Sequence, residues 1–308
     1  MTIYSASLVF SQKRPSETPT RIISCFVLWF FLICFLSLSA CSSVQLGYNQ
    51  GDTLMRWWID DYLDLSSEQV DIVNDSLKKE FAWHRSTQLA LIQKSLLKLK
   101  PRIGKPLTVA ELQDSYEDAH KHSMDIAEHV IPNSAKLALL LSQNQLKVLQ
   151  RKFEANNQKF IKQYVAGTPQ QQLDARVEKI IDSLEVVYGS MSKGQRSQIS
   201  KLVEEHPIDI KTVFNERIRR QKDLLAILQK VVDEKPSLPA TEAMLLKLVR
   251  TFELGNTTEQ KEFETTRLNS NFQLISAITQ IMTEAQRRQA QSRVGQWVDD
   301  VQVLISER

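Results

Sequence analysis

The chain has 308 residues, 42% of them hydrophobic, which is enough for a substantial core in one or two domains. Its 39 Lys and Arg residues stand against 36 Asp and Glu residues, and three of the basic residues but only one acidic residue lie within the first 40 positions. The charges beyond residue 40 therefore nearly balance, which argues against a nucleic-acid-binding protein.

The first 40 residues have the order of features found in a bacterial signal peptide. Three basic residues precede an uncharged apolar run over residues 22–38, and small residues follow this run. Leu38-Ser39-Ala40-Cys41 resembles the lipobox of bacterial lipoproteins, in which a peptidase cuts before a cysteine that carries acyl chains. The resemblance implies that Cys41 becomes the first residue of the mature protein. The alternative is an uncleaved signal anchor that ends near an ordinary cysteine.

Acylation of Cys41 would tether the mature chain to a membrane. Each buried methylene contributes about 0.8 kcal/mol, so two or more acyl chains hold a protein stably. Position 42 is Ser, whereas lipoproteins kept at the inner membrane tend to carry Asp there. We therefore expect the outer membrane, with the protein facing the periplasm. No cysteine follows Cys41, which excludes an intrachain disulfide in the mature protein.

Helical periodicity continues through the rest of the chain. Apolar residues recur at steps of three and four, as in Leu146, Leu149 and Phe153, and no segment shows the strict alternation typical of a strand. Short breaks at Pro and Gly favour antiparallel neighbours. The sequence predicts an all-α fold, a multi-helix antiparallel bundle that is either compact or elongated.

The expected organisation has three parts. Residues 1–40 are predicted to be the cleaved lipoprotein signal peptide, and residues 41–51 a lipidated tether. Residues 52–308 are predicted to form a helical domain of unknown function, and they contain no low-complexity segment.

A short pattern recurs in which Leu or Met precedes Ser or Thr, with Gln three residues further on. The hydroxyl residues are Ser66, Ser142, Ser192 and Thr283, and Thr108 begins a variant with Glu. This spacing is typical of a capping box, in which the hydroxyl and the third residue satisfy each other's backbone N–H groups. The pattern also resembles the Leu-Thr-x-x-Gln motifs of periplasmic helical chaperones, which implies client binding, but capping is the favoured interpretation.

A second set of residues comes after the lipobox in a characteristic order. They are Tyr48-Asn49, Asp60-Asp61-Tyr62, Gln69 and Trp83-His84-Arg85. This order is similar to that of an uncharacterised family of bacterial lipoproteins built on a domain of unknown function. The resemblance is strongest over residues 41–90, and it implies a lipid-anchored helical protein with no assigned activity.

The chemistry of these residues suggests a polar clasp. Asp60 and Asp61 lie shortly before the predicted cap at Ser66, where the helix dipole favours negative charge. Arg85 could pair with either aspartate, which would join the first two helices. The functional alternative for this cluster is a binding surface that faces the membrane.

Several aromatic residues invite two interpretations. Trp57, Trp58 and Tyr62 are expected to be buried in the bundle, and the alternative is that they contact lipid headgroups as interfacial aromatics do. Five phenylalanines in the apolar stripes are expected to belong to the core rather than to a ligand site: Phe81, Phe153, Phe160, Phe252 and Phe272.

The sequence offers little chemistry for catalysis. It contains no glycine-rich phosphate loop, Gly-x-Ser-x-Gly elbow or His-Glu-x-x-His helix, and Cys41 is reserved for acylation. His122, Asp125 and His129, together with Asp118, have the spacing of one helical face and are a weak metal candidate. A solvated polar stripe is the preferred interpretation, so neither enzymatic activity nor a cofactor is expected.

These observations together predict a membrane-anchored envelope lipoprotein that acts as a non-enzymatic binding or scaffold protein. Its partners would be the membrane, through acyl chains on Cys41, and an unidentified envelope protein, with no role for nucleic acid. The alternatives are a chaperone-like client binder and, less favoured, a metal-binding protein or an enzyme.

Overall fold

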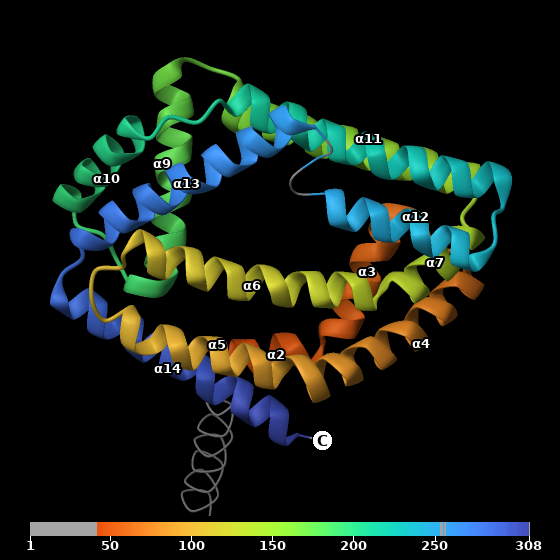
Figure 1. Cartoon of the computed structure of the whole chain (residues 1–308), viewed down its shortest axis with the longest axis horizontal. Coiled ribbons are helices and arrows are strands. Elements are labelled where there is room, and N and C mark those ends of the chain that lie inside the picture. The colour runs from red at the N-terminus through yellow and green to blue at the C-terminus, as the bar shows by residue number, and fades with distance from the viewer. Residues whose placement is uncertain (1–41, 253–254, 256, 308) are drawn as a thin grey trace, which may run out of the picture. The chain divides into compact units, whose positions relative to one another are not determined.

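The computed structural model describes residues 42–252, 255 and 257–307 (Figure 1). The chain divides into two compact units, Met1–Ser43 and Val44–Arg308. The predicted signal peptide and Cys41 lie outside the described residues. Almost all of the described residues belong to the second unit.

All regular secondary structure in the described part of the chain is helical, which confirms the predicted all-α, multi-helix fold. The α-helices are α2 (Ser43–Asn49), α3 (Gly51–Leu63), α4 (Ser67–Trp83), α5 (Leu89–Arg102), α6 (Val109–His129), α7 (Ile131–Leu140), α8 (Gln143–Phe160), α9 (Pro169–Tyr188), α10 (Lys193–Glu205), α11 (Ile210–Glu234), α12 (Leu238–Thr251), α13 (Thr258–Gln280) and α14 (Glu284–Ser306). Two π-helical segments, η1 (His84–Gln88) and η2 (Ile161–Val165), continue α4 and α8. Among the described residues, no helix is both long and apolar enough to span a bilayer.

The helices of this unit pack as neighbours that are often distant in sequence. In Figure 1, α11 runs along one side of the unit, and α4 and α5 run along the opposite side. α14 packs along α5, α12 packs along α7, and α3 lies against both α4 and α8. Helices far apart in the chain therefore meet throughout the unit, and its walls are built from several segments of sequence.

Buried side chains form two main clusters. The larger cluster joins α9, α10, α13 and α14, and its centre holds the fully buried Ile199, Ile278 and Val294. The second joins α7, α8 and α11, with Leu146 and Val231 at its centre. Full burial of such an aliphatic side chain contributes about 1.5–3 kcal/mol, so these clusters supply much of the stability of the unit.

Capping boxes begin seven of the described helices. In each box a Ser or Thr hydroxyl accepts from the backbone N–H three residues on, and the Gln or Glu at that position accepts from the cap N–H. The five boxes predicted from the sequence are confirmed. Thr168 and Thr257 begin the two boxes that the recurring pattern missed.

The glutamine of one capping box bonds directly to the glutamine of another. Gln145 Nε2 donates to Gln69 Oε1 (2.7 Å), and Gln69 Nε2 donates back to Gln145 Oε1 (3.3 Å). Each amide also reaches the end of the helix that precedes the other cap. Gln69 donates to the carbonyl of Leu140 (2.8 Å), and Gln145 donates to that of Asp64 (3.2 Å). This buried amide pair therefore ties the α3–α4 hairpin to the α7–α8 hairpin.

The same arrangement occurs again between α9–α10 and α13–α14. Gln195 Nε2 donates to Gln286 Oε1 (2.7 Å), and Gln286 donates back (3.3 Å). Gln195 also donates to the carbonyl of Ile281, and Gln286 to that of Ser190. The chain thus contains two pairs of helical hairpins, and a reciprocal glutamine pair joins the hairpins of each.

Candidate apolar binding site

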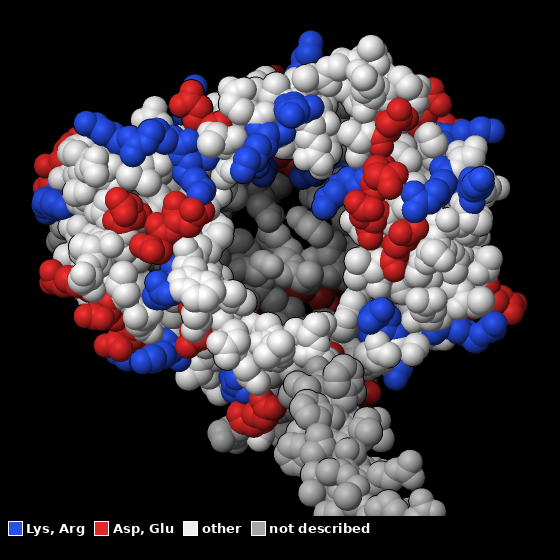
Figure 2. Space-filling view, turned by 180° about the vertical axis from the view of Figure 1, so that it is seen from behind, with Lys and Arg blue, Asp and Glu red and all other residues white. Residues whose placement is uncertain are grey.

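A cavity of about 1120 Å³ lies among α2, α3, α4, α6, α7, α8, α11 and α12. It exceeds the range of about 300–1,000 Å³ that is usual for small-molecule pockets. Most of the side chains on its wall are aliphatic or aromatic. Figure 2 shows that the surface of the described unit is hollowed between its helices, with both basic and acidic side chains around the rim. A large apolar space in such a protein is a candidate binding site.

The wall of the cavity is formed by helical stripes. On α4, the lining residues include Val73, Leu77 and Phe81, which are spaced by four and so share one face. On α11, Leu224 and Leu228 do the same. These stripes are the periodic pattern that predicted helices from sequence, but here part of each stripe faces an open space instead of a neighbouring helix.

The aromatic residues of the stripes differ from the expectation that they belong to the core. Phe81, Phe153, Phe160 and Phe252 all line the cavity, and Phe252 remains 41% exposed. Only Phe272 of the five lies away from the cavity wall, where its ring packs edge-on against Tyr116. The physical reason is that the helices carrying these rings diverge around the cavity, so their apolar faces are not fully covered.

Polar groups on the α4 side of the cavity bond mainly to one another. Glu80 Oε1 accepts from Asn133 Nδ2 (2.6 Å), and Glu80 Oε2 lies 3.2 Å from His129 Nε2. The His129 imidazole stacks on the Trp83 indole, with ring centroids 3.5 Å apart. Asn133 thus satisfies one oxygen of this carboxylate, while the buried Oε2 accepts no hydrogen bond from the described residues and has only the His129 ring nearby.

His84 and Tyr48 also lie on the wall and share a hydrogen bond of 2.9 Å between Nδ1 and the phenol oxygen. Burial lowers the pKa of His84 from its usual 6.5, so its imidazole is neutral at pH 7. Burial raises the pKa of the Tyr48 phenol, although the nearby Arg85 opposes this shift. The wall at this point therefore carries no charge near neutral pH.

The two ends of the predicted family motif meet in space. Arg85 Nη2 donates to Asn49 Oδ1 (2.7 Å), and the Arg85 guanidinium lies 5.1 Å from the centre of the Tyr48 ring. Arg85 Nη1 donates to the carbonyls of Leu304 and Glu307 at the end of α14. The hypothesis that Arg85 pairs with Asp60 or Asp61 is therefore wrong, because its guanidinium caps the C-terminal helix and clasps α2 to it.

The two aspartates of the motif have other partners. Asp60 Oδ1 accepts from the backbone N–H of Leu65 (3.0 Å) in the turn between α3 and α4. Asp61 forms an ion pair with Lys152 on α8. Both aspartates lie at the C-terminal end of α3. Asp60 stabilises the turn that leads into α4, and Asp61 links α3 to α8.

Tyr62 and Gln69 complete the motif. Tyr62 packs against Phe153, and its phenol oxygen accepts from Asn156 Nδ2 (2.8 Å), so this side chain lines the cavity and contacts α8. Gln69 belongs to the first glutamine pair. Of the nine motif residues, Tyr48, Tyr62, Trp83 and His84 line the cavity, and the other five contact neighbouring helices or turns.

The expected burial of the tryptophans near the N-terminus of the unit is wrong. Trp57 is 56% exposed and Trp58 is 57% exposed, although Trp58 also lies at the cavity wall and packs on Tyr62. α3 contacts α4 and α8 through its other face, which leaves Trp57 and Leu54 outward. The alternative interpretation, contact with lipid headgroups, stays a prediction.

The weak metal candidate is not assembled in the described structure. His122 Nε2 lies 3.2 Å from Ser95 Oγ, Asp125 pairs with Lys121, and His129 turns to Glu80. Asp118 pairs with Lys98. Among the described residues, no group of three or more His, Cys, Asp or Glu side chains could hold a metal ion.

The fold and the cavity define an all-helical protein with a large apolar binding space. The chain belongs to a family described as Family of unknown function (DUF6279), whose model matches residues 61–253. This confirms the prediction of an uncharacterised family, and the matched range contains both Gln69 and the Trp83-His84-Arg85 triplet. No curated protein and no solved structure matches the chain.

Proposed function

We propose that this protein is a membrane-anchored envelope lipoprotein whose helical unit binds an apolar molecule in the cavity between α4, α8 and α11. The cavity of about 1120 Å³ and its apolar wall carry the proposal. Each methylene of a guest that leaves water for such a wall contributes about 0.8 kcal/mol. A binding role without catalysis is favoured because His84 and one oxygen of Glu80, two ionisable groups on the wall, are hydrogen-bonded to neighbouring side chains.

Support for the membrane anchor comes from the sequence. Cys41 comes after an apolar run and small residues in the order of a lipobox. Shortly after it come exposed apolar side chains that do not line the cavity and that suit contact with a bilayer: Val44, Leu46, Leu54 and Trp57. The proposed location is the periplasmic face of the outer membrane, and an envelope protein partner is compatible with it.

Acylation of Cys41 can be tested in cells supplied with an alkyne-labelled fatty acid. Wild-type protein should carry the label, and the Cys41→Ala variant should lose it, because the thiol is the only proposed attachment point. Labelling is read by coupling a fluorophore to the alkyne after gel separation. Equal labelling of the two proteins would contradict the anchor.

The binding function can be tested with N-phenyl-1-naphthylamine, an uncharged dye that fluoresces in apolar surroundings. We would use the acylated mature protein, which begins at Cys41, held in an amphipathic polymer without detergent. Ser76 is a small, half-buried residue of α4 on the cavity wall, so Ser76→Trp should place an indole in the cavity. We expect this variant to bind the dye at least about tenfold more weakly, which corresponds to about 1.4 kcal/mol.

The matched control is Ser183→Trp, which adds the same indole to an exposed position of α9. This variant should bind the dye as wild type does. If wild-type protein gives no saturable fluorescence beyond that of the polymer alone, or if both variants bind equally, the proposed function is wrong.

A client-binding chaperone is the second candidate, because a cavity of this size could also accept an apolar segment of an unfolded chain. The recurring glutamine motif supports this candidate less, since four of its glutamines are already engaged in reciprocal pairs. Suppression of client aggregation by wild type but not by Ser76→Trp would favour the chaperone. Dye binding without suppression would favour a small apolar ligand.

A further inference from the structure

The cavity wall carries few charged side chains, and some of them are paired with an opposite charge within the described part of the chain while others are not. On the α4 side, Glu80 accepts a hydrogen bond from Asn133, and its other oxygen lies 3.2 Å from His129 Nε2. On the opposite side, α11 contributes Arg217 and Arg220. A charged group that has no partner within the protein is available to bind the polar end of a ligand.

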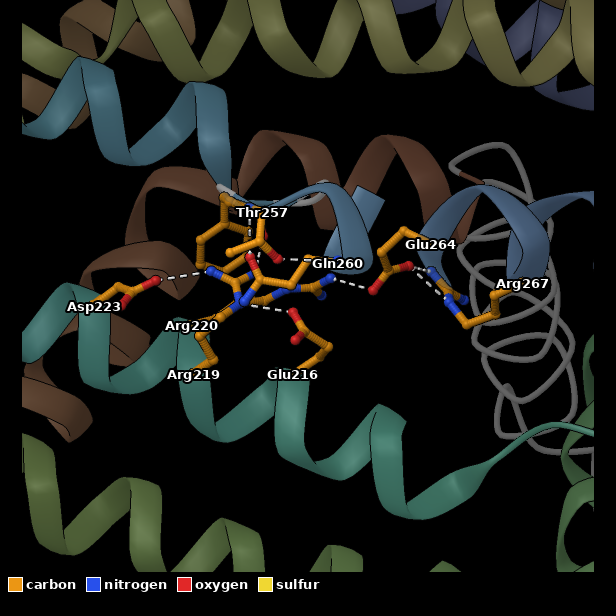
Figure 3. Close-up of polar contacts among 9 residues, drawn as sticks. Glu216, Arg219, Arg220, Asp223, Thr257, Gln260, Glu264 and Arg267 are labelled. Atoms are coloured by element: carbon orange, nitrogen blue, oxygen red, sulfur yellow. Dashed lines mark hydrogen bonds and ion pairs between the residues drawn. The ribbon is translucent and has the colours of Figure 1, made fainter. Parts of the chain in front are cut away.

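The arginines around Arg217 are engaged with carboxylates. Arg220 Nη2 donates to Glu264 Oε1 (2.8 Å), and Arg267 donates to the other oxygen of the same carboxylate. Figure 3 shows these two side chains converging on Glu264 from opposite sides. Arg219 bonds to two carboxylates of its own helix. The positive charges of these three arginines are therefore compensated within the protein.

Arg217 differs from these three arginines because its hydrogen-bond partner is an uncharged amide. Its Nε donates to Asn157 Oδ1 (2.8 Å), which fixes the direction of the guanidinium. Asn157 is itself buried and exchanges hydrogen bonds with Gln221, so the anchoring amide is held in place. The guanidinium lies 5.5 Å from the centre of the Phe160 ring. No carboxylate of the described residues lies within 4.0 Å of it, and its two terminal nitrogens bond to no described residue.

A half-buried cation without a counter-ion is costly, and an anionic ligand would relieve that cost. The guanidinium is planar and binds carboxylate or phosphate oxygens through two parallel N–H bonds. With Nε already used, the paired terminal nitrogens remain for such an anion. Arg217 therefore resembles a preorganised anion-binding group at the wall of an otherwise apolar cavity.

The apolar wall extends away from this group for a defined length. From Arg217 the lining continues along α11 through Gln221 and Leu224 to Leu228. At 1.5 Å per residue this part of the helix spans about 16 Å. That length matches half of the roughly 30 Å hydrocarbon core of a bilayer, which is the depth of one acyl layer. A linear acyl chain therefore fits the wall better than a compact apolar molecule does.

We propose that the cavity holds the acyl chain of an anionic amphiphile and that Arg217 binds its head group. This inference rests on the proposed binding function and adds the chemical class of the ligand. The chain contacts Leu224, Leu228 and the phenylalanines of the wall, and the carboxylate or phosphate accepts from Arg217. Both a fatty acid and an acidic lysolipid have this chemistry.

The test is competition against N-phenyl-1-naphthylamine on the acylated mature protein. The competitors are palmitate, palmitoyl lysophosphatidate and, as the uncharged reference, monopalmitoylglycerol. At least one anion should displace the dye about tenfold more effectively than the uncharged reference, as expected for a charge-assisted contact. Arg217→Gln should abolish that preference, measured as the ratio of anionic to uncharged competition within the same variant, and Arg217→Lys should restore part of it.

Arg250→Gln is the matched control, because it removes one positive charge from an exposed pair with Glu128. It should leave the preference intact. A preference for palmitate alone identifies a carboxylate head group, and a preference for the lysolipid alone identifies a phosphate. Equal competition by all three ligands, or a preference that survives Arg217→Gln, overturns the inference while leaving the binding function standing. Failure of the dye to bind wild type overturns both.

Discussion

Replacing Gln145 with alanine is expected to lower the free energy of unfolding by about 2–4 kcal/mol. The change removes half of a capping box, which costs about 1 kcal/mol. It also leaves the Gln69 amide buried without its reciprocal partner, at a further cost of about 1–3 kcal/mol. The carbonyl of Asp64, at the end of α3, loses a donor as well. Guanidinium denaturation followed by far-UV circular dichroism measures the difference from wild type.

Gln171 provides the matched control for this prediction. It completes the capping box that begins at Thr168, but its side chain is exposed and pairs with no other glutamine among the described residues. Gln171→Ala should therefore lower the free energy of unfolding only by the roughly 1 kcal/mol that the lost capping interaction contributes. The double variant Gln69→Ala with Gln145→Ala should cost less than the two single changes combined, because the second change removes the unpaired amide. Equal losses for Gln145→Ala and Gln171→Ala would show that the pairing adds nothing.

Glu264→Ala is expected to cost about 3 kcal/mol of unfolding free energy. The Glu264 side chain is only 5% exposed and accepts from Arg220 on α11 and from Arg267 on its own helix (Figure 3). Removing the carboxylate would leave two guanidinium groups close together without their shared anion. The value lies at the lower end of the range for buried pairs because both arginines remain partly exposed. Thermal and guanidinium denaturation would each report the loss.

Glu128→Ala is the appropriate comparison, because it breaks an Arg–Glu pair that lies in solvent. The pair between Glu128 and Arg250 links α6 to α12 with both side chains well exposed. Its loss should change stability little, since water and salt screen such pairs. Glu264→Gln should fall between wild type and Glu264→Ala, because the amide oxygen can still accept one hydrogen bond. A loss for Glu128→Ala as large as that for Glu264→Ala would refute the argument from burial.

Local signals in the sequence were sufficient to predict the helical class of the fold and five of the helix starts. Apolar spacing indicated the helical stripes, and hydroxyl–Gln spacing indicated the caps at Ser66, Ser142, Ser192 and Thr283. The caps at Thr168 and Thr257 were missed because Gly167 and Asn256, rather than an apolar residue, precede them. The capping chemistry itself needs only the hydroxyl and the glutamine.

The tertiary uses of the same residues could not be predicted. A capping glutamine has the same local pattern whether its amide faces water, as at Gln171, or another glutamine, as at Gln69. Phe81 and Phe153 fit the pattern of core residues because an apolar stripe does not reveal whether its neighbour is a helix or a cavity. Arg217 stands out only once its neighbours on α11 and α13 are known to hold carboxylates.

The π-helical segment η1 has a mechanical consequence for the cavity. Helical structure continues without a break from α4 through η1 into α5, and the direction of the helix changes where α4 and α5 meet (Figure 1). Side chains advance by about 100° per helical residue, and the wider turn of a π-helix absorbs one residue more. Phe81 can thereby face the cavity while Leu89 faces Val301 in the seam with α14. Deleting one residue after η1 would rotate only the part of α5 that follows the deletion, and so would disturb the seam with α14 but leave Phe81 facing the cavity. The position of a deletion, more than its size, therefore decides which of the two surfaces is disturbed.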